Sequence, residues 1–310
     1  MKICWNDLTL EEWDALFARV PRSNLLQSWP YAQMMRAEKQ MSTRFGRLID
    51  GNDTLAIFQI HEVRLTPLYH VVTLDRGPLW LLEDVTQQHW QAFIDLFTAE
   101  FPKRFGRRRR FMPEVTSRDE VGVLSGSGFA HKAAGYQSIW LDLNREEEHL
   151  RKNLKQKWRN ALNQSEKKNL DVIERNGPLS FRWLMNEYEK DRQDKLYQGP
   201  SVKVLSSLYG FCRPRDEVML MVAEQDNAQV AAILLFLHGT SATYQVGWTG
   251  AKGRDARAHQ RLLWEAICLL KARGLTWLDL GGIHPDQAEG VTRFKRGLGG
   301  EEFQLAGVYA

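Results

Sequence analysis

The sequence predicts an α/β protein made of two modules with the same order of elements. Segments in which apolar and polar residues alternate are typical of strands, and they are interspersed with segments typical of amphipathic helices, whose apolar residues recur three and four positions apart. The order of these segments near the start of the chain returns near its end. A length of 310 residues exceeds the usual single domain of about 100 to 200 residues, which also favours two domains.

The first module is predicted to begin with two helices, followed by three antiparallel strands, a further helix and a closing strand. The first two strands are joined by Asp50-Gly51-Asn52-Asp53, a composition typical of a tight turn. The predicted elements are, in order, helices at residues 8–20 and 29–41, strands at 45–49, 55–65 and 68–74, a helix at 88–105 and a strand at 108–115.

The second module repeats the order of three strands, a long helix and a closing strand. Additional elements precede these strands, and Gly177-Pro178 and Gly199-Pro200 break the chain among them. The predicted elements are, in order, a strand at residues 136–143, a basic helix at 145–168, a helix at 179–195, strands at 218–223, 230–237 and 243–248, a helix at 256–273 and a strand at 277–280.

A last strand at residues 301–309 is expected to return to the first module. We therefore place the first domain at residues 1–142, completed by 300–310, and the second domain at residues 143–299. A repeated order of elements arises from duplication or by coincidence, and the sequence alone leaves both origins open.

The composition is that of a globular protein, with 43% hydrophobic and 26% charged residues. The longest apolar run, residues 230–237, stops at His238 and is far shorter than the roughly 20 residues of a transmembrane helix. Acidic residues near the N-terminus argue against a signal peptide. Cys4, Cys212 and Cys268 are widely separated, without the spacing of a zinc site or a disulfide framework. We expect a cytoplasmic protein with no transmembrane segment.

The net charge of +4 is small, but the cations are concentrated in two clusters. Such clusters contact phosphates or form a solvated face, and the sequence leaves both readings open. The first cluster contains Lys103, Arg104, Arg107, Arg108, Arg109 and Arg110. The second contains Arg151, Lys152, Lys155, Lys157, Arg159, Lys167 and Lys168.

Several classes of enzyme lack their motifs in this sequence. Gly-x-Ser-x-Gly, the Walker loop and a Gly-x-Gly-x-x-Gly after a strand are all missing, which disfavours serine hydrolases, nucleotide hydrolases and Rossmann-type dehydrogenases. The nearest approach to a metal site is Asp279, His284 and Asp286, but a histidine following two glycines is more simply a turn residue. We expect no metal.

Three short motifs, two in the last third of the chain and one near its start, are similar to those of a known family. The family's Asp-x-Gly-Gly is matched by Asp279, Gly281 and Gly282. Its Phe-Lys-x-x-Phe-Gly is matched by Phe294, Lys295 and Gly299, with Leu298 in place of the second aromatic residue, and its Gln-Ser-x-x-Trp opening resembles Gln27, Ser28 and Tyr31. In these motifs the chain resembles the Fem family of peptidoglycan-bridge aminoacyltransferases. The resemblance implies a tandem duplicated GNAT-like (acyl-CoA N-acyltransferase-like) α/β fold.

The resemblance also implies a reaction, in which an amino acid moves from aminoacyl-tRNA to the amine of a peptidoglycan precursor peptide. The ester-to-amide transfer passes through an oxyanion, which a preorganised cation stabilises. Lys295 is the candidate catalytic residue, with no cofactor required. The candidate donor-binding residues are Phe294, Asp279, Gly281 and Gly282. The candidate acceptor-binding residues are Arg36, Ser201, Lys203 and Tyr244, and the candidate contacts to RNA or phosphate are Lys155 and Arg159. Peripheral contact with a membrane-linked substrate is a further option.

Two alternatives remain open. A CoA-dependent N-acyltransferase acting on another amine would use acetyl-CoA or another acyl-CoA as co-substrate. Such enzymes resemble one another in a glycine turn before the long helix, where backbone amides take the pyrophosphate, whereas here residues 251–259 lack the second glycine and contain Asp255. A non-catalytic protein that binds RNA or glycan is the other alternative, and the presence of Lys295 and Asp279 argues against it. The acyl group, the acceptor and the oligomeric state stay open.

Overall fold

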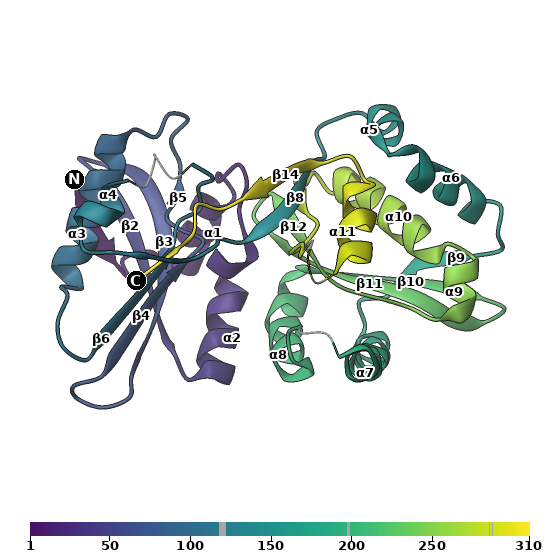
Figure 1. The fold of residues 1–310 in the computed structure, drawn as a ribbon, viewed down its shortest axis with the longest axis horizontal. Helices are drawn as coiled ribbons and strands as arrows, with labels where there is room; N and C mark the ends of the chain where they lie inside the picture. Colours follow the sequence, from purple (N-terminus) through teal and green to yellow (C-terminus); the bar gives the residue numbers. More distant parts are fainter. Residues whose placement is uncertain (118–121, 197–198, 285, 287) are drawn as a thin grey trace. The chain divides into compact units, whose positions relative to one another are not determined.

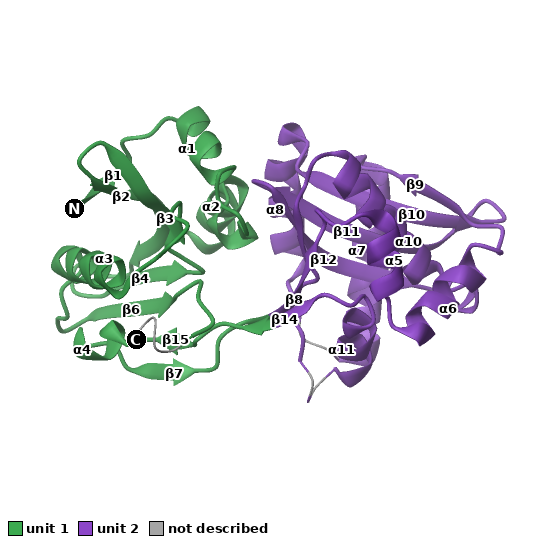
Figure 2. Ribbon diagram, turned by 90° about the horizontal axis from the view of Figure 1, so that it is seen from above, with its two compact units in different colours: residues 1–137, 303–310 green, residues 138–302 purple. Residues whose placement is uncertain are grey.

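The computed structural model describes residues 1–117, 122–196, 199–284, 286 and 288–310 as a mixed α/β structure with two sheets (Figure 1). The chain divides into two compact units (Figure 2). Unit 1 contains Met1–Gln137 and Phe303–Ala310, and unit 2 contains Ser138–Glu302.

Unit 1 is built on a sheet with the strand order β1-β2-β3-β4-β6-β15-β7, with β5 paired to β3 at one side. Its helices are α1 (Leu10–Phe17), α2 (Trp29–Lys39), α3 (Gln87–Glu100) and α4 (Val123–Gly126), with a short 3-10 helix, η1, at Leu25–Gln27. Its strands are β1 (Lys2–Trp5), β2 (Ser42–Asp50), β3 (Asp53–Arg64), β4 (His70–Asp75), β5 (Leu79–Trp80), β6 (Arg107–Met112), β7 (His131–Ala133) and β15 (Val308–Tyr309).

The alternating directions of side chains along β3 explain why unit 1 has a core on each face of its sheet. Ala56 and Phe58 point to the core that includes Phe93 of α3, whereas Ile57 points to the other core, with Trp13 of α1. Successive side chains of a strand point to opposite faces, so one strand supplies both cores. Figure 2 shows α3 on one side of the strands and α1 and α2 on the other.

Unit 2 is built on a sheet with the strand order β14-β8-β13-β12-β11-β10-β9. The strands of this sheet are β8 (Gln137–Asp142), β9 (Asp171–Glu174), β10 (Val218–Gln225), β11 (Ala228–His238), β12 (Ser241–Thr249), β13 (Trp277–Asp279) and β14 (Glu301–Gln304), and the boundary between the units falls within β8 and β14. The helices of unit 2 are α5 (Glu147–Asn153), α6 (Gln156–Ser165), α7 (Pro178–Lys195), α8 (Val202–Cys212), α9 (Ala251–Asp255), α10 (Ala258–Ala272) and α11 (Glu289–Arg296), with a 3-10 helix, η2, at Arg213–Arg215.

Helices cover both faces of the second sheet. Leu263 and Ile267 of α10 share a core with Ile233 of β11 and with Trp158 of α6. Figure 1 shows α7 and α8 on the opposite face, where Trp183 of α7 packs edge-on against Trp248 of β12. Because both faces of the central strands are covered, β10 and β11 are apolar almost throughout, which is the pattern expected of a strand buried on both sides.

The two units share one plan. In unit 1 the antiparallel strands β2, β3 and β4 are followed by α3 and then by β6, which runs parallel to β4. In unit 2 the antiparallel strands β10, β11 and β12 are followed by α9 and α10 and then by β13, which runs parallel to β12. The tandem α/β fold predicted from the repeated order is confirmed.

Two predicted elements are each divided in the structure, and a third is preceded by an additional short helix. The basic helix predicted at 145–168 is two helices, α5 and α6, because Leu154 and Lys155 adopt extended backbone angles and the Lys155 N–H donates to Gly297 O, 2.9 Å away. The helix predicted at 256–273 is preceded by α9, and the left-handed φ of 57° at Arg257 separates α9 from α10. The strand predicted at 301–309 is β14 and β15, which belong to different sheets.

Candidate active site at the separation of two parallel strands

The parallel strands β12 and β13 of unit 2 pair over a short distance only. Their pairing runs from Ser241 opposite Trp277 to Thr243 opposite Asp279, where β13 ends, while β12 continues to Thr249. At the same point β12 has a bulge, since Gln245 has no Cα partner on β11. A bulge bends the strand that contains it, so β12 is bent beside Tyr244.

The equivalent strands of unit 1 do not separate in this way. β4 and β6 stay paired from His70 opposite Arg107 to Asp75 opposite Met112. Ligands of α/β sheets bind where neighbouring strands part, beyond their carboxyl ends. The candidate site is therefore in unit 2.

Lys295 lies in the last turn of α11 and is buried, with 7% of its surface exposed. Its Nζ donates to the carbonyl oxygens of Gly281, at 3.1 Å, and Gly282, at 2.9 Å. Burial lowers the pKa of Lys295 to about 8, and the nearby charge of Asp279 opposes this shift. The same Nζ lies 5.5 Å from the ring centroid of Tyr244. The amine is therefore still mainly protonated at neutral pH, in a position shielded from water.

Asp279 shapes the turn that holds Lys295. Its side chain is fully buried, and its Oδ1 accepts hydrogen bonds from the Ser138 hydroxyl and from the Gly281 N–H, the latter at 2.9 Å. Gly281 has a φ of +75°, and a Cβ there would lie 2.5 Å from Tyr244 O. Only glycine fits this turn without strain. Asp279 and Gly281 thus orient the two carbonyls that bind Lys295.

A second polar pair lies beside Lys295. The hydroxyl of Tyr244 lies 2.9 Å from His259 Nε2, within hydrogen-bond distance. Burial lowers the pKa of His259 to about 4, so the imidazole is neutral at pH 7. The side chains of Tyr244 and His259 can meet only because residue 247 is a glycine. A Cβ at this position would lie 1.9 Å from Tyr244 Oη and 2.5 Å from His259 Nε2.

Aromatic rings form one wall of the site. The Phe294 ring packs edge-on against His259, with centroids 5.5 Å apart, and lies 5.9 Å from the ring of Trp158. Phe294 and Lys295 are adjacent on α11, so the wall and the cation are positioned by the same helix turn.

The structure brings together six of the predicted site residues, namely Lys295, Phe294, Asp279, Gly281, Gly282 and Tyr244. It adds three that the sequence analysis missed: Ser138, Trp158 and His259. Gly247, inside the predicted strand at 243–248, could have indicated this site in the sequence, because a glycine within a strand often marks a close approach of other groups.

The other predicted acceptor residues belong to helices α8 and α2. Ser201 caps α8, accepting a hydrogen bond from the Val204 N–H, and Lys203 is exposed on the first turn of that helix. Tyr244 packs against the core on the α10 side of the sheet, whereas α8 covers the opposite side (Figure 1). Arg36 is exposed in the last turn of α2, in unit 1.

The two predicted phosphate contacts lie on α6. Lys155 is exposed at its start, and Arg159 is half-buried, with Nη1 donating to Lys152 O at 3.0 Å. Part of the Arg159 donor capacity is therefore used within the protein.

Gln27 and Ser28, which matched the opening motif, have structural partners in unit 1. The Gln27 amide donates to Asp75 O, at 2.7 Å, and accepts from the Gln59 N–H, also at 2.7 Å. Ser28 caps α2 through the Tyr31 N–H. This motif holds the start of α2 to the sheet.

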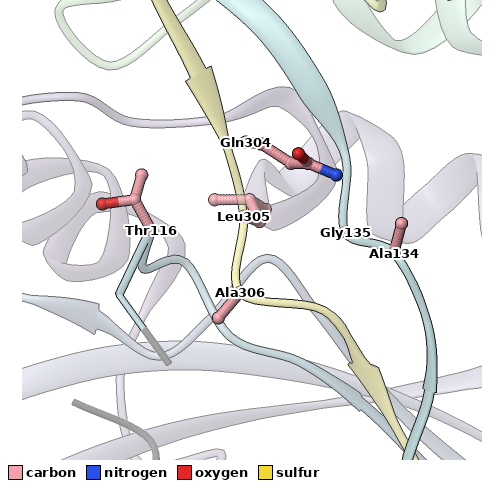
Figure 3. A pocket seen from close by; sticks show the side chains of 6 residues that line it. All are labelled: Thr116, Ala134, Gly135, Gln304, Leu305 and Ala306. Atoms are coloured by element: carbon pink, nitrogen blue, oxygen red, sulfur yellow. The ribbon is translucent and has the colours of Figure 1, made fainter. Parts of the chain in front are cut away.

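A cavity of about 240 Å³ lies in unit 1 between the segments around Gly135 and Leu305 (Figure 3). Its lining contains no ionisable side chain, which makes it a poor candidate for catalysis; the lining residues are Thr116, Ala134, Gly135, Gln304, Leu305 and Ala306. Within the described ranges, no three or more His, Cys, Asp or Glu side chains are grouped as a metal site would require. Among the same residues, no helix is long and apolar enough to cross a bilayer.

The protein has two units of the GNAT acyltransferase fold in tandem. The parallel strands β12 and β13 separate in the second unit, whereas β4 and β6 stay paired in the first. Residues 148–296 match the family model described as the acetyltransferase (GNAT) domain. The crystal structure of FemX has a similar fold over the whole chain, which confirms the predicted resemblance: it superposes with a TM-score of 0.85 at 14% identity, covering 100% of this chain and 96% of that chain.

Two further solved structures have a similar fold. L-PGS from Bacillus licheniformis has a TM-score of 0.52 at 12% identity, covering 86% of this chain and 83% of that chain. A tandem GNAT protein from the clavulanic acid biosynthesis pathway has a TM-score of 0.51 at 12% identity, covering 99% and 98%. No curated protein sequence matches the chain.

Gly247→Ala is expected to separate Tyr244 from His259 and to destabilise the protein by about 1 to 3 kcal/mol, because the new methyl group overlaps both side chains. Urea-induced unfolding measures the effect. Gly210→Ala is the matched control, since a Cβ at Gly210 meets nothing within 4 Å and alanine favours the helix there. Equal stability of the two variants would contradict the close packing at Gly247.

Proposed function

We propose that the protein transfers an aminoacyl group from aminoacyl-tRNA to the amine of a peptidoglycan precursor peptide, in the cytoplasm and without a cofactor. The observation that carries the proposal is the buried Lys295 cation, held by two carbonyls where β12 and β13 separate. The neutral acceptor amine attacks the ester carbonyl and the carbon–nitrogen bond forms. The bond to the ribose oxygen then breaks, the nitrogen loses one proton, and the ribose oxygen gains one and leaves as a hydroxyl. Negative charge develops on the carbonyl oxygen, where a preorganised cation lowers the barrier.

The other site residues have supporting roles in this reaction. The Tyr244 hydroxyl, aligned by neutral His259, supplies an uncharged hydrogen-bonding group beside the cation. The ring of Phe294 supplies an apolar wall for the terminal adenosine or the donated side chain. Asp279 keeps the Gly281-Gly282 turn in the conformation that holds Lys295.

The segment before α10 favours aminoacyl-tRNA over acyl-CoA as the donor. The backbone N–H groups of Arg254, Ala256 and Arg257 already donate to carbonyls of the same segment. Gly253 is explained by packing, because a Cβ there would lie 2.3 Å from Val230 O. A CoA pyrophosphate would therefore find several of its expected amide donors occupied.

A CoA-dependent N-acyltransferase acting on another amine is the second candidate. It is supported by the acetyltransferase family model that matches residues 148–296. The same Lys295 would then stabilise the oxyanion formed from a thioester.

Mass spectrometry of the acceptor distinguishes the two candidates. The protein is incubated with a peptidoglycan precursor peptide and either a mixture of charged tRNAs or acetyl-CoA. We expect the acceptor to gain one amino acid residue from the charged tRNAs. Acetylation of the acceptor, with no amino acid gained, would replace the proposal by the second candidate.

Acetyl-CoA is expected to leave the melting temperature unchanged at micromolar concentration. A ligand at about 100 times its dissociation constant stabilises the native protein by roughly 2.7 kcal/mol, which thermal unfolding detects readily. A charged tRNA is the comparison ligand and is expected to raise the melting temperature. Saturable stabilisation by acetyl-CoA alone would contradict the assigned donor.

Reversing the charge of Lys155 and Arg159 together is expected to weaken tRNA binding and to flatten its salt dependence. Each phosphate that the protein no longer neutralises reduces the slope of log K against log salt by about one unit at most. Filter binding at several salt concentrations measures the slope. Arg182→Glu, an exposed reversal on α7, is the control. An unchanged slope in the double variant would assign α6 to the solvated surface.

A further inference from the structure

Two loops of unit 1 lie side by side at one end of its sheet (Figure 1). One joins β3 to β4, and the other joins α3 to β6. The His70 N–H donates to Gly106 O at 2.9 Å. Gly106 has a φ of +75°, and a Cβ there would lie 2.1 Å from Leu68 O, so the two backbones are in direct contact. The pair of loops forms one surface, which we call the loop tip.

The loop tip exposes three large apolar side chains. Leu65 is 65% exposed, Leu68 is 72% exposed and Phe105 is 93% exposed. Phe105 is the most exposed large apolar residue in the part of the chain that the structure describes. Single exposed apolar residues are common, but three that share one surface indicate an interaction site.

Cations surround these apolar side chains. Arg64 precedes the first loop, and Lys103 and Arg104 belong to the second, all three exposed; Arg107 and Arg108 follow at the start of β6. The pKa of Arg107 is lowered by burial first and then by the charges of Arg104 and Arg64, so cations of both loops lie near one another.

Two carboxylates near the loop tip, those of Glu62 and Glu100, oppose the lowering of the pKa of Arg107, and each also contacts another side chain. Glu62 lies 2.8 Å from His70 Nε2, and Glu100 binds Arg44, also at 2.8 Å. The basic run in the sequence is divided in the structure: Arg109 is buried, donating to Phe101 O and Gly128 O, and Arg110 pairs with Asp75. The positive charge that remains is concentrated around the loop tip.

We propose that the loop tip docks unit 1 on an anionic lipid bilayer. Its apolar side chains enter the boundary between headgroups and acyl chains, and its cations contact the lipid phosphates. Branched aliphatic side chains such as Leu65 and Leu68 have no flat face for stacking on a nucleobase, so the surface fits a bilayer better than RNA. The inference does not depend on which acyl donor the protein uses.

Vesicle flotation tests the proposal with the full chain. We expect binding to vesicles of phosphatidylcholine mixed with an equal amount of phosphatidylglycerol, and much weaker binding to phosphatidylcholine alone. Replacing both Leu68 and Phe105 with serine should weaken binding roughly tenfold or more, because their apolar groups no longer enter the bilayer. Arg104→Glu should weaken it by at least roughly fivefold. All three residues are exposed, so the fold tolerates the changes.

Two control variants change similar side chains outside the loop tip. Leu179→Ser replaces another leucine that is 73% exposed, and Lys132→Glu reverses an exposed charge on β7 of the same unit. Both should bind vesicles like the unaltered protein. Unchanged binding by the Leu68/Phe105 double variant would overturn the proposal. So would a loss of binding to uncharged tRNA in that variant with no loss of vesicle binding, which would assign the surface to RNA.

Discussion

Lys295→Met is expected to lower the rate of acyl transfer by about 10² to 10³ while the protein remains folded. This is the usual loss when one preorganised group that stabilises an oxyanion is removed. Methionine is similar to lysine in length, so the space between α11 and the Gly281-Gly282 turn stays filled. Lys252→Met, which changes an exposed lysine of α9, is the control and should keep full activity.

The pH dependence of the rate gives an independent reading of the same residue. Because the pKa of Lys295 is about 8, the rate of the unaltered protein should fall as the pH rises through 8, when the cation is lost. The residual rate of Lys295→Met should lack this decrease. A near-normal rate in the variant, with either donor, would contradict the catalytic role of Lys295.

The stability of the protein should change with pH in the opposite direction. The pKa of Lys295 is about 8 in the folded protein against an ordinary value of 10.5, so the unfolded chain binds more protons between these two pH values. The free energy of unfolding should therefore rise from pH 8 to about pH 10.5, by up to about 3 kcal/mol. Urea unfolding of Lys295→Met across this range should show no such rise.

Asp279→Ala is expected to destabilise the protein by about 3 kcal/mol or more. The substitution leaves the Gly281 N–H without its acceptor and the Ser138 hydroxyl with Gly281 O as its acceptor, and it removes the negative charge nearest to the buried Lys295. The Gly281-Gly282 turn then loses its support, so activity should fall as well. Urea unfolding measures the stability.

Two further variants sharpen this experiment. Asp279→Asn keeps an oxygen that can accept from the Gly281 N–H and should cost less than alanine. Asp255→Ala changes an exposed carboxylate of α9 and should leave the stability within about 0.5 kcal/mol. A loss below about 1 kcal/mol for Asp279→Ala would show that the turn does not depend on this carboxylate.

Residue patterns predicted the repeated order of three strands, a long helix and a closing strand, and the family motifs supplied the candidate site residues. The strand periodicity at residues 218–223, 230–237 and 243–248 depends on neighbouring residues, and it predicted β10, β11 and β12 correctly. The candidate site residues Asp279 and Lys295 were found because each belongs to a short motif in which the residues are close in sequence. Local patterns of both kinds can be read without knowing which segments meet.

Contacts between distant segments had to come from the tertiary structure. The interruption between α5 and α6 depends on burial of Leu154 and on the bond from Lys155 to Gly297, which is far away in the sequence. His259 joined the site because a bulge and Gly247 on β12 let Tyr244 reach it. Contacts with distant segments also decide which cations between Lys103 and Arg110 are buried, which are paired and which are exposed.

The sequence by itself determined the tandem α/β fold, because hydrophobic periodicity selects strands and helices locally and their order restricts the topology. Through a short family motif it also provided Lys295 as the candidate cation of the site. Only the tertiary structure decided which module has the separated strands, what lowers the pKa of Lys295 and which cations surround the exposed loop tip. These properties depend on burial and on distances between segments far apart in the chain, which no local pattern encodes.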